Sequence, residues 1–144
     1  MATVRLHADA LDPAAVTALL GPAEVAAPKG GVLRQTRGGH EVRAKTGTWF
    51  ASTPSHVQSP DPAEHLRWAV DRVAPRMSDL SRLAPGVAVE FSAMVSGAEA
   101  DARAVLDRFE RALAAELARA REFGTVLLDI PSSGFVQVLG RRAP

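Results

Sequence analysis

Three helix-start signals limit what this chain can fold into more than any other feature of the sequence. Asp12-Pro13, Asp61-Pro62 and Ser96 each place a side-chain oxygen before a helical segment, where it can accept a hydrogen bond from a backbone N–H without a helical partner. Proline suits the first helical position because it has no N–H to leave unpaired and its φ is already helical. Glu64 and Glu99 follow two of these caps by three residues, which is the spacing of a capping box. We therefore predict that helices begin at these three points.

Short alternating or apolar runs separate the helix starts, and such runs are typical of strands. The recurrence of apolar residues every three or four positions predicts helices over residues 12–20, 61–83 and 97–123. Strands are expected over residues 3–8, 32–37, 40–45, 47–53, 87–95, 125–130 and 135–139.

Glycine and proline mark the remaining segments. Gly38-Gly39 predicts a tight primed turn that joins two strands into a hairpin, and residues 24–31 are expected to form a loop. Pro75 predicts a kink or a break in its helix, because proline removes a helical hydrogen bond. The element order predicts one α+β domain over residues 1–144, with helices on one face of a mainly antiparallel sheet and a ferredoxin-like core.

Composition excludes several classes of function. The chain has 144 residues and no cysteine, which excludes thiol nucleophiles and thiolate metal sites. No apolar run approaches the roughly 20 residues that span a bilayer, so we expect a soluble, cytoplasmic protein with no membrane partner. The net charge of +1 gives no overall field that would attract nucleic acid. Any charged partner must be met by a local patch.

Several short motifs follow one another in order along the chain: Leu11-Asp12-Pro13, Val16-Thr17, Leu20-Gly21-Pro22, Pro28-Lys29-Gly30, Gly47-Thr48-Trp49, Ser52 and His65-Leu66-Arg67-Trp68. In this order they resemble the bacterial family catalogued as domain of unknown function 4279. The late helix followed by residues 126–130 is similar to the ending of that family. The resemblance implies no activity, substrate or catalytic residue.

The sequence carries no established catalytic motif. It lacks a Gly-x-Ser-x-Gly elbow, a phosphate-binding P-loop and a dinucleotide-type glycine fingerprint. The four histidines are His7, His40, His56 and His65, and no two have the i, i+4 spacing that places two imidazoles on one helical face. We therefore predict neither a metal site nor a bound cofactor.

One candidate site lies on the sheet face turned away from the helices. Strand alternation places His7, Glu90 and Asp129 on that face. If their strands are neighbours, His7 could meet Glu90 or Asp129 and form an acid/base pair for catalysis or small-molecule binding. The alternative is an ordinary solvated face with cross-strand ion pairs.

A second candidate is the segment over residues 29–45, here called the basic hairpin. Its cations can neutralise phosphates or an acidic protein surface, but it lacks the aromatic residues that stack on bases. The alternative is a solvated edge whose charges discourage aggregation. Its basic residues are Lys29, Arg34, Arg37, Arg43 and Lys45, with Glu41 as the single acid and His40 beside the turn.

The third candidate is Trp68, which helical spacing places opposite the apolar stripe of its helix, near His65 and Arg72. Tryptophan is enriched at interface hot spots, so this face could hold a partner. Alternatively, the connector over residues 53–60 folds over the ring.

Together these features favour a binding or protein-interaction module without catalysis, which meets a protein partner through the Trp68 face or the basic hairpin. The second hypothesis is an enzyme or small-molecule binder that uses the open sheet face. The third is nucleic-acid binding through the basic hairpin.

Overall fold

The structure is a computed structural model that describes residues 1–54, 56–59, 61–94, 110–111, 113–130 and 135–139, with residues 128–130 and 135–139 described as backbone only. The chain divides into two compact units. Unit 1 contains residues Met1–Val4, Ser52–Asp71 and Glu90–Pro144, and unit 2 contains Arg5–Ala51 and Arg72–Val89. Whether the chain is a single domain, as the sequence predicts, stays a prediction.

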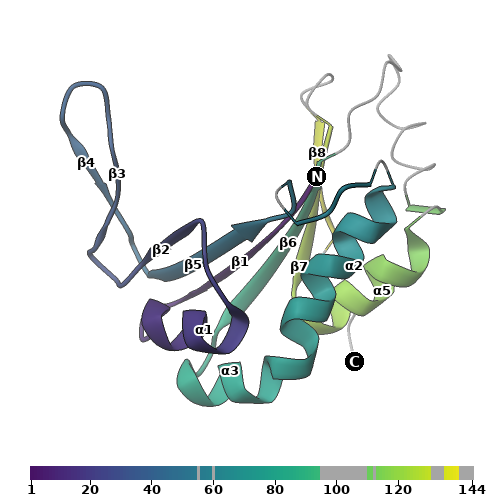
Figure 1. Ribbon diagram of the computed structural model, residues 1–144, viewed down its shortest axis with the longest axis horizontal. Coiled ribbons are helices and arrows are strands. Elements are labelled where there is room, and N and C mark those ends of the chain that lie inside the picture. Colours follow the sequence, from purple (N-terminus) through teal and green to yellow (C-terminus); the bar gives the residue numbers. More distant parts are fainter. Residues whose placement is uncertain (55, 60, 95–109, 112, 131–134, 140–144) are drawn as a thin grey trace. The chain divides into compact units, whose positions relative to one another are not determined.

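Helical segments separate groups of strands along the chain (Figure 1). The strands are β1 (Ala2–Ala8), β2 (Val25–Ala27), β3 (Val32–Gln35), β4 (Glu41–Arg43), β5 (Gly47–Ser52), β6 (Ala88–Met94), β7 (Thr125–Ile130) and β8 (Phe135–Leu139). The helices are α1 (Pro13–Leu20), α2 (Pro62–Val73), a 3-10 turn (Ala74–Arg76), α3 (Met77–Leu83) and α5 (Ala114–Phe123).

The described strands form one sheet in the order β2-β5-β1-β6-β7-β8 and a separate two-stranded sheet of β3 and β4. Strands β2 and β5, β3 and β4, and β7 and β8 pair antiparallel, whereas β6 and β7 pair parallel. This arrangement confirms the predicted α+β class with a mainly antiparallel sheet. The ferredoxin-like core stays a prediction.

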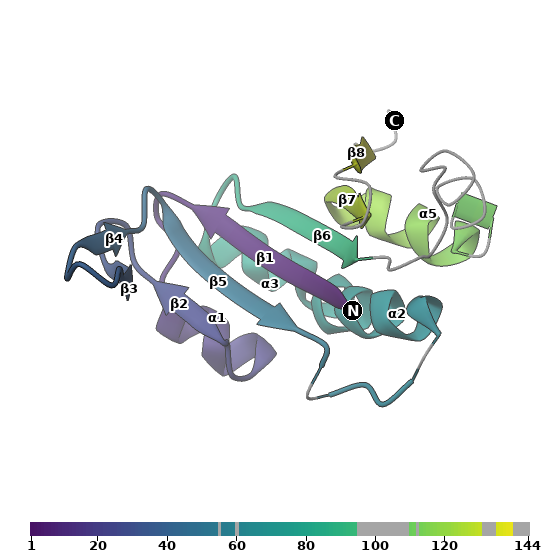
Figure 2. The same ribbon diagram turned by 90° about the horizontal axis from the view of Figure 1, so that it is seen from above.

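In unit 2, helices α1 and α3 lie on one face of the strands β1 and β5 (Figures 1 and 2). Leu6 of β1 and Trp49 of β5 are completely buried, together with Val16 and Leu80 from the two helices. Because side chains alternate along a strand, the residues between these positions point to the opposite face of the sheet. That face carries the candidate site.

In unit 1, α2 and α5 are joined by a network of charged side chains. Arg67 Nε donates to Glu116 Oε1 at 3.0 Å, and Arg119 donates to Glu116 Oε2 at 2.9 Å and to Asp71. The hydrogen bond to Glu116 raises the pKa of Arg67, and the hydrogen bond to Asp71 raises the pKa of Arg119. Glu116 is buried because its carboxylate has two guanidinium partners. Apolar periodicity alone does not predict a buried glutamate here.

Two of the predicted helix caps are confirmed. Asp12 Oδ1 accepts from the N–H of Ala14 at 3.0 Å, and Asp61 Oδ1 accepts from the N–H of Ala63 at 2.9 Å. The N–H of Asp61 donates to Ser59 Oγ at 3.1 Å, so this hydroxyl takes the place that a capping box gives to Glu64. Ser96 and Glu99 lie outside the described residues.

The structure corrects two local predictions. The hairpin turn is longer than a two-residue primed turn. The N–H of Gly39 donates to the Thr36 carbonyl, and the N–H of Thr36 donates to the His40 carbonyl. Of the two glycines, only Gly39 has a positive φ, of 81°. This is a three-residue loop that closes with a bulge. The predicted loop over residues 24–31 contains β2, because Val25–Ala27 finds a partner in β5 that local sequence does not reveal.

The break at Pro75 is confirmed. The 3-10 turn Ala74–Arg76 separates α2 from α3, with proline near its start. The buried residues Val87, Val89, Phe91 and Ala93 confirm the predicted alternation along β6 and just before it. The predicted helix over residues 97–123 is described only at its end, where Leu117 and Ala120 are buried.

Candidate functional site

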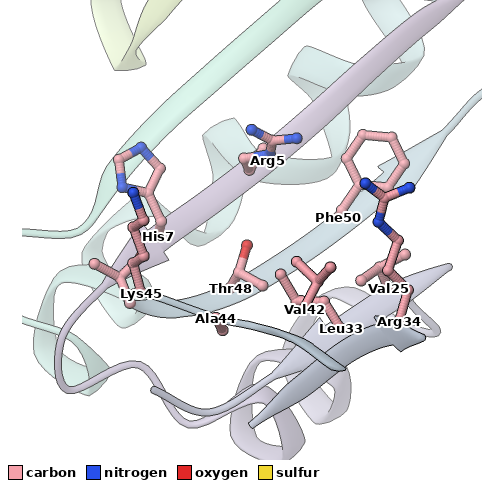
Figure 3. Close-up of a pocket in the computed structure, with 11 residues that line it drawn as sticks. Arg5, His7, Val25, Leu33, Arg34, Val42, Ala44, Lys45, Thr48 and Phe50 are labelled. Atoms are coloured by element: carbon pink, nitrogen blue, oxygen red, sulfur yellow. The ribbon is translucent and has the colours of Figure 1, made fainter. Parts of the chain in front are cut away.

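A pocket of about 510 Å³ lies on the open face of unit 2 (Figure 3). Strands β1, β2 and β5 form its base, and the β3–β4 hairpin and the segment that follows it supply its wall. A ligand of this volume would be a small molecule, since ligand pockets measure roughly 300–1,000 Å³. We call this site the basic pocket; it is lined by Arg5, His7, Val25, Leu33, Arg34, Val42, Ala44, Lys45, Thr46, Thr48 and Phe50.

Strand alternation explains which side chains reach the pocket. Leu6 and Trp49 point into the core, so Arg5 and His7 on β1 and Thr48 and Phe50 on β5 point to the other face. The Arg5 guanidinium lies 5.8 Å from the centre of the Phe50 ring, a cation–π contact that orients it.

Strand β5 approaches the end of β1 closely at Gly47. A Cβ at Gly47 would lie 2.5 Å from the carbonyl oxygen of Leu11 and 2.9 Å from that of Ala8. Only glycine allows this approach, which fixes the start of β5 and therefore the positions of Thr46 and Thr48 in the pocket.

The pocket combines an apolar surface with cationic side chains. Val25, Leu33 and Val42 contribute branched apolar groups, and Phe50 adds an aromatic ring. Arg5, His7, Arg34 and Lys45 supply the basic groups, and none of the aspartates and glutamates that the structure describes lines the pocket. Within the described part of the chain, the side chains of these four basic residues form no ion pair and no hydrogen bond.

The basic hairpin therefore contains two kinds of cation. Lys29 pairs with Asp9 at 3.2 Å, and Arg43 donates to the Gly30 carbonyl at 2.9 Å and pairs with Glu41. Arg43 therefore makes its contacts within the hairpin, whereas Lys29 pairs with a residue outside it. Arg34 and Lys45 instead line the pocket.

Two further residues of the predicted hairpin site lie at its exposed tip. Arg37 and His40 are exposed and do not line the pocket. The contact of His40 with the turn runs through its backbone N–H, which donates to Thr36 Oγ1 at 3.2 Å. Neither side chain takes part in the basic pocket.

The predicted acid/base pair on the open face is not assembled within one unit. His7 belongs to unit 2, whereas Glu90 and Asp129 belong to unit 1. Asp129 is aligned with Met94 in the β6–β7 register, and its side chain is outside the described part of the structure. The pairing of His7 with either carboxylate stays a prediction.

Trp68 is half-buried, and His56 of the connector lies against its ring. The His56 ring stacks on Trp68, with centroids 4.9 Å apart and 14° between the planes. His65 is buried, with Nδ1 2.6 Å from Thr53 Oγ1 and Nε2 2.7 Å from the Ser59 carbonyl. His65 therefore holds the connector in place and is not exposed to a partner. This geometry favours the interpretation in which the connector folds over Trp68.

Arg72 makes its contacts within unit 2. Its guanidinium lies 5.5 Å from the centre of the Trp49 ring and donates to the Pro22 carbonyl at 3.2 Å. Burial lowers its pKa from the ordinary value. Arg72 thus supports the turn after α1 from within unit 2.

Comparison with known proteins assigns the chain to a family. The model of the family described as a domain of unknown function, DUF4279, matches residues 1–120. The chain belongs to the DUF4279 family. Residues 126–130, which resemble the ending of that family, lie beyond the match. In comparisons with curated proteins and with solved structures, nothing matches the chain.

The family match names no activity or ligand for this DUF4279 chain, so the evidence for its function is the geometry of the pocket. Among the described residues, no three His, Asp or Glu side chains gather in a way that could hold a metal ion. None of the described helices has the length and apolar character needed to cross a membrane.

The sequence patterns placed His7 on the open face and Arg34 and Lys45 in the basic hairpin, but most of the pocket was missed. Val25, Thr48 and Phe50 reach it because β2 pairs with β5, and Val42 reaches it because the β3–β4 hairpin contacts β2. One signal was present in the sequence: Arg5 and His7 alternate with apolar residues, while Thr48 and Phe50 alternate with Trp49.

Proposed function

We propose that this DUF4279 domain is a binding module for a small organic anion, which it holds in the basic pocket. The supporting observation is that four basic side chains line an apolar pocket with no acidic residue among them. The proposal develops the second sequence hypothesis, a small-molecule binder on the open sheet face. It assigns no catalytic step.

Electrostatics support an anionic occupant. Like charges that share a small space repel one another, and a carboxylate or phosphate that enters the pocket relieves this repulsion. Arg5 and Arg34 can each offer paired N–H donors to two oxygens of one acid group. The apolar side chains favour an acid with a hydrocarbon body over an inorganic ion, since burying that body adds hydrophobic free energy.

Isothermal titration calorimetry of the full chain tests the proposal. Benzoate is the probe, and benzamide is its neutral isostere. We expect benzoate to bind at least tenfold more tightly than benzamide, because only benzoate neutralises the basic groups. Equal affinities for the two compounds would exclude an anion site.

A matched pair of variants locates the site. Arg34→Gln removes a charge that lines the pocket, and Arg37→Gln removes the same charge from the exposed tip of the same hairpin. Arg34→Gln should raise the benzoate Kd about tenfold, while Arg37→Gln should leave it within about twofold. If both variants weaken binding equally, the attraction comes from the hairpin as a whole and the pocket assignment is wrong.

A further inference from the structure

We infer that the natural ligand of the basic pocket is a dianion whose two acid groups lie at opposite ends of a short apolar body. This inference rests on the proposed anion-binding function and deepens it. It follows from the way in which the four basic groups divide between the two ends of the pocket.

The first end contains His7 and Lys45. The close approach of Gly47 to the Ala8 carbonyl places the end of β1 beside the start of β5. His7 directly precedes Ala8, and Lys45 lies two residues before Gly47. Both basic groups therefore belong to the same end of the pocket, where Figure 3 shows them.

The second end contains Arg5 and Arg34. Arg5 lies over the Phe50 ring, and Phe50 is aligned with Val25 in the β2–β5 register. Figure 3 shows Arg34 at this end, with Phe50 and Val25. An acid group here would meet guanidinium groups on both the base and the wall of the pocket.

The pocket-lining side chains other than these four basic groups carry no charge. Arg5 and His7 are two residues apart on one strand, which corresponds to about 7 Å along it. Thr48, Val42 and Ala44 line the pocket in addition to the residues of the two ends. Figure 3 shows Thr48 and Val42 between Lys45 and Phe50. An aromatic ring or a short alkyl chain fits this spacing.

The number of charges also favours a dianion. Arg5, Arg34 and Lys45 supply three cationic side chains, and His7 is a fourth basic group. A single carboxylate at one end leaves the other end uncompensated. Two acid groups, one at each end, neutralise both.

The test compares three aromatic acids by calorimetry on the full chain. Terephthalate holds its carboxylates on opposite sides of the ring, phthalate holds the same two charges on adjacent carbons, and benzoate has one carboxylate. We expect terephthalate to bind at least tenfold more tightly than either of the others, because only terephthalate reaches both ends.

The outcomes separate the two proposals. If benzoate binds better than benzamide but terephthalate binds no better than phthalate, the two-ended ligand is wrong and the anion site stands. If none of the aromatic acids binds better than benzamide, the proposed function itself fails.

The two lysines of the chain provide matched variants. Lys45→Gln removes the lysine charge from the first end of the pocket and should weaken terephthalate about tenfold, to near the benzoate Kd. Lys29→Gln removes an exposed lysine that pairs with Asp9 outside the pocket and should change the terephthalate Kd by less than about twofold. An unchanged terephthalate Kd in Lys45→Gln would overturn the inference.

Discussion

At the scale of single residues, the Thr53 hydroxyl is central to the buried polar contacts of the connector over residues 53–60. Its side chain is completely buried. Oγ1 accepts from the N–H of Ala2 at 2.9 Å, donates to the Ala2 carbonyl at 3.2 Å and lies 2.6 Å from Nδ1 of His65. One hydroxyl therefore joins the start of β1 to α2 within unit 1.

Thr53→Val keeps the shape of this side chain and removes the hydroxyl. The Ala2 N–H and the His65 ring then lose a buried partner, so the free energy of unfolding should fall by about 2–3 kcal/mol. Thr17→Val on α1 is the control, because the Thr17 hydroxyl has no hydrogen bond within the described residues. This variant should change the free energy of unfolding by less than about 0.5 kcal/mol. Urea denaturation measures both; equal stabilities for Thr53→Val and the parent would show that the cluster contributes nothing.

Sequence analysis identified the candidate residues but not their different roles. Lys29 and Lys45 look alike in the sequence, and only the fold shows that Lys29 meets Asp9 while Lys45 lines the pocket. The spacing of His65 and Trp68 on α2 was informative, but the partners of both come from the connector. Helical periodicity reports which face a residue occupies, not what covers that face.

At the scale of elements, the junction between β1 and β5 depends on Gly47. Gly47→Ala would place a methyl group 2.5 Å from the Leu11 carbonyl oxygen, so the backbone must shift. We expect the free energy of unfolding to fall by about 2–3 kcal/mol. We also expect weaker benzoate binding, because Thr46 and Thr48 flank this position in the pocket.

Gly38→Ala is the matched control for this substitution. Gly38 is exposed in the hairpin turn, and a Cβ there would meet the His40 ring at an ordinary 3.4 Å. Thermal unfolding and benzoate titration should leave Gly38→Ala close to the parent. If the two glycine variants behave alike, the junction between β1 and β5 does not depend on Gly47.

Elements were predictable where their signal is local. The caps at Asp12 and Asp61, the break at Pro75 and the alternation along β6 all arise from neighbouring residues, and the structure confirms them. Strand β2 was missed because Val25–Ala27 becomes a strand only through its pairing with β5. The predicted primed turn was wrong because only Gly39 of the two glycines adopts a positive φ. Pairing and turn geometry depend on contacts that periodicity does not encode.

At the scale of the whole molecule, the net charge of +1 provides almost no overall attraction for an anion. The attraction must therefore come from the local groups of the basic pocket. Raising sodium chloride from about 0.1 M to about 1 M shortens the Debye length from about 10 Å to about 3 Å, so the benzoate Kd should rise several-fold. The Kd of neutral benzamide, measured by calorimetry at the same salt concentrations, is the control. A benzoate Kd that does not change with salt would contradict an electrostatic site.

The α+β class was predictable at this scale, because the alternation of helical and extended patterns determines it. The strand order was not, and the basic pocket depends on that order: β2, β5 and β1 must be neighbours for Val25, Phe50 and Arg5 to share one surface. The site is therefore a property of the assembled unit 2 rather than of any single motif.

The most direct measurement of the central claim is a titration of the isotopically labelled full chain with benzoate, followed by the chemical shifts of the backbone amides. We predict that the largest changes occur at His7, Arg34, Lys45, Thr48 and Phe50, with little change at Arg37. Changes centred on Trp68 or on the hairpin tip, or no change at all, would contradict the assignment of anion binding to the basic pocket.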